Sequence, residues 1–303
     1  MKRTLVLGML VAVGALSITV AAQRGGRGGR GGDAAPMVVE VQKVKDNVYV
    51  LTGGGGNTAA FITSTGVVLV DTKNPGWGQP LLTALRTVTD RPITTVINTH
   101  THGDHVSGQL EFTGTIEYVS HANTKAHMEQ QDAFKQNPRA LPTRTFTDRL
   151  TVGSGNDRID LYYFGRAHTD GDAWVAFPAA GVLHSGDAFA GKQVPLVDSN
   201  SGGSGVAYPD TLMKAYSGVT GIDTIITGHS TTMAWADLKQ YADFNADFLA
   251  WVREQMKAGT PPEQAAKEYT VPARFPGYTA DLPPFFGGME GYLKSMYTEL
   301  GAR

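Results

Sequence analysis

The chain has 303 residues, of which 41% are hydrophobic, with no cysteine and a formal net charge of −2. This length and apolar content are enough for a packed core, which excludes a fibrous or wholly disordered protein. Without cysteine the chain can form no disulfide, and a thiol nucleophile or a lipid-modified N-terminal cysteine is excluded.

Residues 1–22 have the layout of a secretory signal peptide. Lys2 and Arg3 precede the apolar run Leu5–Leu16, and small residues stand at Ala21 and Ala22. The apolar run is shorter than the roughly 20 residues of a membrane-spanning helix, so we expect cleavage after Ala22 and no stable membrane anchor. The sequence therefore predicts a periplasmic or secreted protein.

Residues 23–36 form a Gly/Arg-rich segment, which we interpret as a flexible linker ahead of one domain at residues 37–303. Residues 1–32 contain five basic and no acidic residues, so the remainder has 21 basic and 28 acidic residues. A net charge of about −7 is not that of a nucleic-acid groove, and we expect no nucleic-acid partner.

The domain begins with short apolar runs that are typical of strands: "VVEVQKV", "NVYVLTG", "TAAFIT" and the nearly continuous "GVVLVDT". A helix is predicted from Pro80, with Leu81, Leu85 and Val88 on one face. The strand "ITTVIN" follows it and leads directly into a cluster of histidines.

The second half continues this alternation. We expect a strand at "TIEYVS", a helix through "ANTKAHMEQQDAFKQ", an irregular stretch from Asn137 to Asp148 and a strand at "RIDLYYF". A hairpin joins "DAWVAF" and "VLHSG", and a helix from Pro209 precedes the strand "IDTIIT". A long helix near the C-terminus has a stripe of core residues, namely Trp235, Leu238, Tyr241, Phe244, Phe248 and Val252.

Three of the eight histidines lie within six residues, in the motif "HTHGDH". A buried imidazole needs a partner, so such a cluster indicates metal binding. His100 and His102 are two residues apart and point to the same side of an extended segment, where they can hold one ion. Beyond a turn at Gly103, Asp104 and His105 can reach a second ion.

Three further candidate ligands follow predicted strands: His168, Asp187 and His229. Open α/β sheets bind ligands at the carboxyl ends of their strands. We expect His168 to complete three imidazoles on the first ion and His229 to join the second. Asp187, with two carboxylate oxygens, can bridge both ions.

The segments "HTHGDH", "GRAHTDGD", "HSGD" and "TGHS" together resemble the ligand motifs of the metallo-β-lactamase-fold hydrolases. This resemblance covers about Val38 to Ser230 and implies an α/β (α+β) fold: an αββα sandwich of two mixed β-sheets flanked by helices. Asp71 matches a family aspartate that braces the histidine loop, with a strand-end turn as the alternative. The β-lactamase branch with a cysteine ligand is excluded. Asp187 is similar to the bridging aspartate of the glyoxalase II, lactonase and broader hydrolase branches.

We therefore predict an exported hydrolase of a small-molecule substrate with two divalent metal ions, zinc being expected and iron or manganese the alternatives. A metal-bridged hydroxide would attack an ester, lactone, thioester or amide-like bond, with Asp104 orienting the nucleophile. The alternatives are a β-lactamase and a non-catalytic metal-binding protein of the same fold. Lys192 is a candidate for binding an anionic substrate group, and Asp172 either supports a ligand imidazole or caps a turn. The sequence leaves the substrate and the oligomeric state open.

Overall fold

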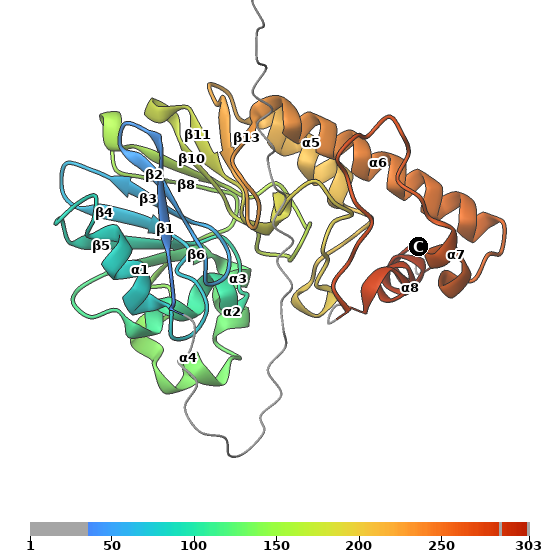
Figure 1. The fold of residues 1–303 in the computed structure, drawn as a ribbon. Helices are drawn as coiled ribbons and strands as arrows, with labels where there is room; N and C mark the ends of the chain where they lie inside the picture. The colour runs from blue at the N-terminus through green and yellow to red at the C-terminus, as the bar shows by residue number, and fades with distance from the viewer. Residues whose placement is uncertain (1–35, 285–286, 302–303) are drawn as a thin grey trace, which may run out of the picture. The chain divides into compact units, whose positions relative to one another are not determined.

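Two mixed β-sheets form the centre of the fold in the residues that the computed structural model describes, which are 36–284 and 287–301 (Figure 1). The predicted signal peptide and all of the predicted linker except Pro36 lie outside the described residues. Contacts group the chain from Met37 onward in one unit.

The first sheet has the strand order β1-β2-β3-β4-β5-β6-β7. Its strands are antiparallel from β1 to β4 and parallel from β4 to β7. Parallel neighbours require a crossover, and the helix α1 (Gly78–Leu85) provides the one between β4 and β5. The strands are β1 (Glu40–Lys45), β2 (Val48–Thr52), β3 (Thr58–Ile62), β4 (Val67–Val70), β5 (Ile93–Asn98), β6 (Glu117–His121) and β7 (Arg144–Phe146).

The second sheet has the order β13-β12-β11-β10-β9-β8. Its strands are antiparallel except for the parallel pair β11 and β12. The strands are β8 (Arg149–Val152), β9 (Ile159–Tyr162), β10 (Trp174–Phe177), β11 (Val182–His184), β12 (Thr224–Ile226) and β13 (Met233–Ala234).

The two sheets pack face to face over an apolar core. In β4, Val68 and Val70 point into the space between the sheets, whereas Leu69 points to the outer face and packs near Leu81 of α1. All four residues of β4 are buried because the sheet is covered on both sides, which explains its continuous apolar sequence. This arrangement confirms the predicted αββα sandwich.

Helices from the C-terminal part cover the outer face of the second sheet. The predicted stripe is confirmed as core, since all of its members except the half-buried Trp235 are buried on α6 (Trp235–Lys257). Among the described residues, no helix combines the length and apolar content needed to cross a bilayer. The other helices on this side are α5 (Tyr208–Gly218), α7 (Pro262–Glu268) and α8 (Gly288–Gly301) (Figure 1).

Two expectations about residues 122–152 are wrong. The predicted helix is broken into α3 (Ala122–Met128) and α4 (Asp132–Gln136), because the side chain of Gln131 donates to the carbonyl and hydroxyl oxygens of Thr101 and holds the chain between them. The stretch expected to be irregular contains β7 and leads into β8, short edge strands of mixed polarity with little periodic signal.

Candidate metal centre

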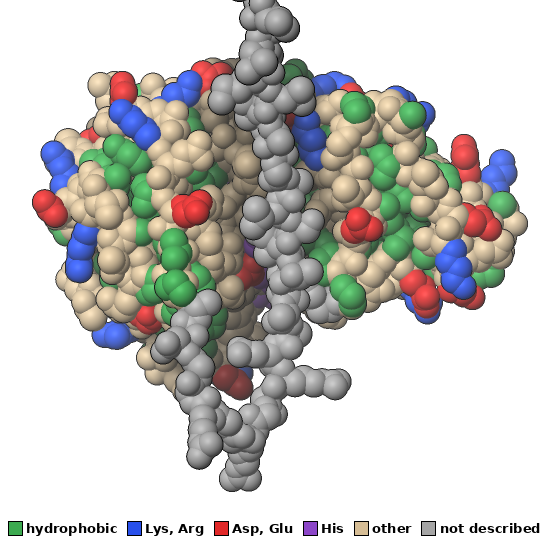
Figure 2. Space-filling model, viewed as in Figure 1, with side chains coloured by type: hydrophobic (Ala, Val, Ile, Leu, Met, Phe, Trp, Pro, Cys, Tyr) green, Lys and Arg blue, Asp and Glu red, His purple; other side chains and the backbone are tan. Residues whose placement is uncertain are grey.

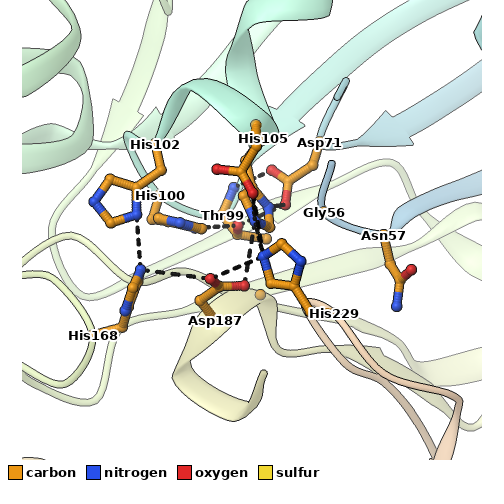
Figure 3. Close-up of polar contacts among 12 residues, drawn as sticks. Gly56, Asn57, Asp71, Thr99, His100, His102, His105, His168, Asp187 and His229 are labelled. Atoms are coloured by element: carbon orange, nitrogen blue, oxygen red, sulfur yellow. Dashed lines mark hydrogen bonds and ion pairs between the residues drawn. The ribbon is translucent and has the colours of Figure 1, made fainter. Parts of the chain in front are cut away.

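The structure brings the seven predicted ligand side chains together at the carboxyl ends of strands (Figure 3). The histidine motif follows β5 and forms the short helix α2 (Gly103–Val106), while the other ligands follow β9, β11 and β12 of the second sheet. Figure 2 shows histidine side chains reaching the surface beside an acidic side chain, in a hollow of the molecule. The centre is therefore built from loops of both sheets.

His100, His102 and His168 form the first group of candidate ligands, with one ligand atom from each within 4.8 Å of the others. The Nε2 of His168 lies 2.9 Å from the Nδ1 of His102. The Nε2 of His100 is buried and has no hydrogen-bond partner in the structure. Three converging imidazole nitrogens, one of them otherwise unsatisfied, fit a divalent ion.

Asp104, His105 and His229 form the second group, also within 4.8 Å. The Nε2 of His229 lies 3.2 Å from the Oδ2 of Asp104 and 3.2 Å from the Nε2 of His105. The side chains of His229 and Asp104 are 37% and 31% exposed, whereas His105 is fully buried. A ligand could therefore approach this group from solvent.

Asp187 lies between the two groups on the 3-10 helix Gly186–Phe189. Its Oδ2 is 3.6 Å from the Nε2 of His168 and 3.2 Å from the Nε2 of His229. Its Oδ1 is 3.3 Å from the Nε2 of His105 and makes no hydrogen bond in the structure. This carboxylate reaches both groups, which fits the position of a bridging ligand.

The two groups differ in their electrostatics. Burial lowers the pKa of His168 to about 4, and burial together with His105 holds the pKa of His100 well below its usual value, so these two imidazoles are neutral at pH 7. In the second group burial alone would lower the pKa of His229, but the carboxylates of Asp187 and Asp104 raise it to about 9. These carboxylates stabilise a proton on the His229 imidazole, which a bound cation would replace.

Asp71 contacts the histidine loop directly, as a bracing residue would. Its Oδ1 accepts the Thr99 N–H at 2.8 Å, and its Oδ2 accepts the Thr99 hydroxyl at 2.7 Å and faces the Nδ1 of His105 at 2.7 Å. The Thr99 hydroxyl oxygen in turn lies 2.9 Å from the Nδ1 of His100. One carboxylate thus orients two imidazoles so that their Nε2 atoms point into the centre. Asp71 has a φ of 63°, in the left-handed region that aspartate adopts more readily than most other non-glycine residues.

Two outer contacts were missed by sequence reasoning. The Nε2 of His102 pairs with the Oδ2 of Asp198 at 2.8 Å, and the Nδ1 of His168 donates to the Leu196 carbonyl at 2.8 Å. Both partners lie in the loop that follows Asp187. A single aspartate in a Gly/Ser-rich loop carries no spacing signal, and a backbone carbonyl carries none at all.

Two other predicted site residues have partners of their own. Asp172 accepts the N–H and hydroxyl of Thr169, so it caps a turn beside His168. The Nζ of Lys192 lies 2.8 Å from the Oδ1 of Asp237. This pair lies at a pocket of about 620 Å³ that His229 also lines.

A family profile described as "Metallo-beta-lactamase superfamily" matches residues 51–249. The "Metallo-beta-lactamase type 2" of Bacteroides fragilis is 24% identical over 63% of this chain and 79% of its own length. The "2,4-dinitroanisole O-demethylase subunit alpha" of a Nocardioides strain is 28% identical over 69% of this chain, which spans only 61% of that relative.

Solved structures show the same fold. A metallo-beta-lactamase from Pontibacter korlensis aligns with a TM-score of 0.58 and 19% identity, over 69% of this chain and 99% of that one. The stereoselective inverting sec-alkylsulfatase Pisa1 from Pseudomonas sp. aligns with a TM-score of 0.71 and 14% identity, over 86% of this chain but half of its own. At these identities the likeness concerns the fold alone.

The variant Asp71→Asn tests the bracing contacts. Asparagine tolerates a positive φ, so the backbone is preserved, but its amide must turn an N–H toward a donor at Thr99 or His105. We expect metal affinity to fall by roughly 10- to 100-fold, measured by competition with a chromophoric chelator. Asp160→Asn, at another buried aspartate that pairs with Arg158, is the control and should leave metal affinity unchanged. Equal affinity in Asp71→Asn and the unaltered protein would contradict the bracing role.

Metal binding should release protons at neutral pH. With a pKa of about 9 in the metal-free protein, His229 is protonated at pH 7 and must lose its proton to bind a cation. We expect calorimetric titrations in buffers of different ionisation enthalpy to show proton release at pH 7 that declines above pH 9. The apparent affinity for metal should rise between pH 7 and pH 9, because the competing proton on His229 is lost. An affinity that does not change with pH in this interval would contradict the expectation.

Proposed function

Because the chain belongs to the metallo-beta-lactamase superfamily, we propose that it is a metal-dependent hydrolase with two divalent ions bound in this centre. The main support is that Asp187 lies within reach of two facing groups of ligand atoms. His100, His102 and His168 would hold the first ion and Asp104, His105 and His229 the second, and Asp187 would contribute a carboxylate oxygen to each.

When bound, two divalent ions make water a stronger acid and polarise the substrate oxygen. The side chains supply the rest of the chemistry. Burial alone would raise the pKa of Asp104, but His105 and His229 lower it to about 2, so this carboxylate is ionised and accepts hydrogen bonds at neutral pH. It is also partly exposed, and we assign it the role of orienting the attacking water through a hydrogen bond.

We propose zinc as the metal, since imidazole and carboxylate ligands with room for a water are typical of catalytic zinc. Iron and manganese share this ligand preference and are the alternatives. Metal analysis of the protein as purified distinguishes them.

The pocket beside His229 is the proposed site of the substrate. Its lining consists mainly of small, hydroxyl-bearing and polar residues with one ion pair, and among the described residues no phenylalanine, tyrosine or tryptophan lines it. We propose that it binds a polar part of a small molecule. An anionic group of that molecule would contact Lys192 by displacing Asp237 from its ion pair with this lysine. The hydroxyl-bearing lining residues are Ser230, Thr231, Thr232 and Thr279.

The scissile bond is proposed to be an ester, lactone, thioester or amide-like bond. β-Lactam hydrolysis is the second candidate, because a relative that shares the family is named a metallo-beta-lactamase. The position of Asp187 between the two groups supports the first candidate, because this aspartate resembles the bridging aspartate of the glyoxalase II and lactonase branches.

Metal-dependent turnover tests the function. We expect the purified protein to cleave at least one of an acyl lactone, a glutathione thioester and a chromogenic β-lactam, and to lose this activity on chelation and regain it with zinc. Asp104→Ala should lower kcat by at least about 100-fold, in line with loss of a group that orients the attacking water and is a proposed metal ligand. Turnover that survives both metal removal and this substitution would contradict the proposal, and cleavage of the β-lactam alone would favour the second candidate.

We also propose that the protein is exported, on the basis of residues 1–22. The mature protein should begin at Gln23 and be found outside the cytoplasm. N-terminal sequencing after fractionation measures this, and a full-length chain retained in the cytoplasm would contradict it.

A further inference from the structure

Asn57 connects the first sheet to two loops of the second sheet. It lies just before β3 and is 5% exposed. Its N–H donates to the Gly228 carbonyl at 2.7 Å, and its Nδ2 donates to the carbonyls of Thr227 and Ser230 at 2.8 and 2.7 Å. Its own carbonyl accepts a hydrogen bond from the Nε2 of His184 at 3.0 Å. Four hydrogen bonds therefore join this residue to the other half of the sandwich.

Three of these bonds hold the loop that carries His229. The carbonyls of residues 227, 228 and 230 surround His229 in the chain, and all three accept from Asn57. The loop lies between β12 and β13, strands of three and two residues, and the His229 side chain is 37% exposed. Short strands and an exposed side chain fix a ligand poorly, so these bonds hold the backbone from which it projects.

The fourth bond extends the same restraint to Asp187. His184 donates through Nε2 to Asn57, and its Nδ1 accepts the N–H of Gly186, the residue before Asp187, at 3.0 Å. The geometry is tight here, because a Cβ added at Gly228 would lie 1.9 Å from the Oδ1 of Asp187. Asn57 thus contacts the segments that carry His229 and Asp187, two of the three candidate ligands from the second sheet.

On its other side, the segment before Asn57 packs against the ligands from the first sheet (Figure 3). The Gly56 N–H donates to the Asp104 carbonyl at 3.0 Å, and a Cβ at Gly56 would lie 2.1 Å from the His105 ring. The fully buried Lys73 donates from Nζ to the carbonyls of Leu51 and Gly56 at 2.6 Å each. These contacts fix the connection between β2 and β3 at Gly56, so this part of the backbone is a rigid part of the centre.

We propose that Asn57 is a positioning residue that sets the spacing between Asp104 and His105 of the first sheet and His229 and Asp187 of the second, and thereby the second metal position. The inference rests on the proposed function only in assuming that an ion binds there. The first position should be much less affected, because His168 is held by the Leu196 carbonyl and His102 by Asp198.

The substitution Asn57→Asp tests this. It keeps the shape of the side chain but replaces the two Nδ2 donors with an oxygen that faces the carbonyls of Thr227 and Ser230. We expect the dissociation constant of the second zinc ion to rise by roughly 10- to 100-fold and that of the first by less than about threefold. Both constants are measured by titrating metal-free protein with zinc against a chromophoric chelator. Asn57→Ser, which retains one hydroxyl donor, should give an intermediate loss and serves if the aspartate variant does not fold.

Asn245→Asp is the matched control. Asn245 is 3% exposed, and its Nδ2 donates to the Tyr241 carbonyl within α6. The substitution therefore removes a buried hydrogen bond of a side-chain amide and contacts no segment that carries a candidate ligand. We expect both dissociation constants to remain as in the unaltered protein. Because the readout is the difference between two constants, a general loss of stability does not reproduce it.

The outcomes separate this inference from the proposed function. Selective weakening of the second ion in both Asn57 variants supports the inference even if no substrate is cleaved, in which case only the hydrolase proposal fails. Equal weakening of both ions, unchanged constants, the same pattern in Asn245→Asp, or a single zinc equivalent in the unaltered protein would each overturn it.

Discussion

The constraint on which this structure depends is that an imidazole in the centre can direct one ring nitrogen inward only if the other nitrogen is fixed from outside. A free ring would rotate, and a buried nitrogen without a partner is costly. Four of the candidate ligand histidines meet this requirement. Each uses a different partner, which lies in the same loop or in a neighbouring one. His100 uses Thr99, His105 uses Asp71, His102 uses Asp198 and His168 uses the Leu196 carbonyl.

These outer partners explain why a sandwich is needed for a small site. Asp71 stands at the end of β4 in the middle of the first sheet, whereas Asp198 and Leu196 belong to a loop that leaves the second sheet. Packing of the two apolar faces, with Phe61 and Phe177 rings 5.0 Å apart, brings the two sets of strand ends to one edge. Burial of these apolar faces therefore fixes the positions of the polar groups at the shared edge.

Much of the fold and the ligand set could be predicted from the sequence because both have local signals. Period-two and continuous apolar runs mark strands, and "HTHGDH" places four candidate ligands in six residues. What could not be predicted is set by tertiary contacts. Lysine is usually exposed, and Lys73 follows a strand without a local signal of burial. It is nevertheless fully buried, because its Nζ donates to the carbonyls of Leu51 in β2 and of Gly56 in the β2–β3 connection. Asp198, Asn57 and the break at Gln131 are of the same kind, since each depends on a partner distant in sequence.

Membership of the family does not identify the substrate, because part of the pocket is built by a segment outside the residues that match the family. Three segments line the pocket beside His229: the loop after Asp187, residues 229–237 and the segment around Thr279. The first and the last are joined by backbone hydrogen bonds, since the Thr279 N–H donates to the Lys192 carbonyl and the Val194 N–H to the Thr279 carbonyl. Thr279 lies beyond residues 51–249, the part that matches the family. The candidate ligands thus lie within the residues that match the family, whereas part of the lining of the proposed substrate pocket comes from a segment outside that match, so family membership alone does not define the substrate.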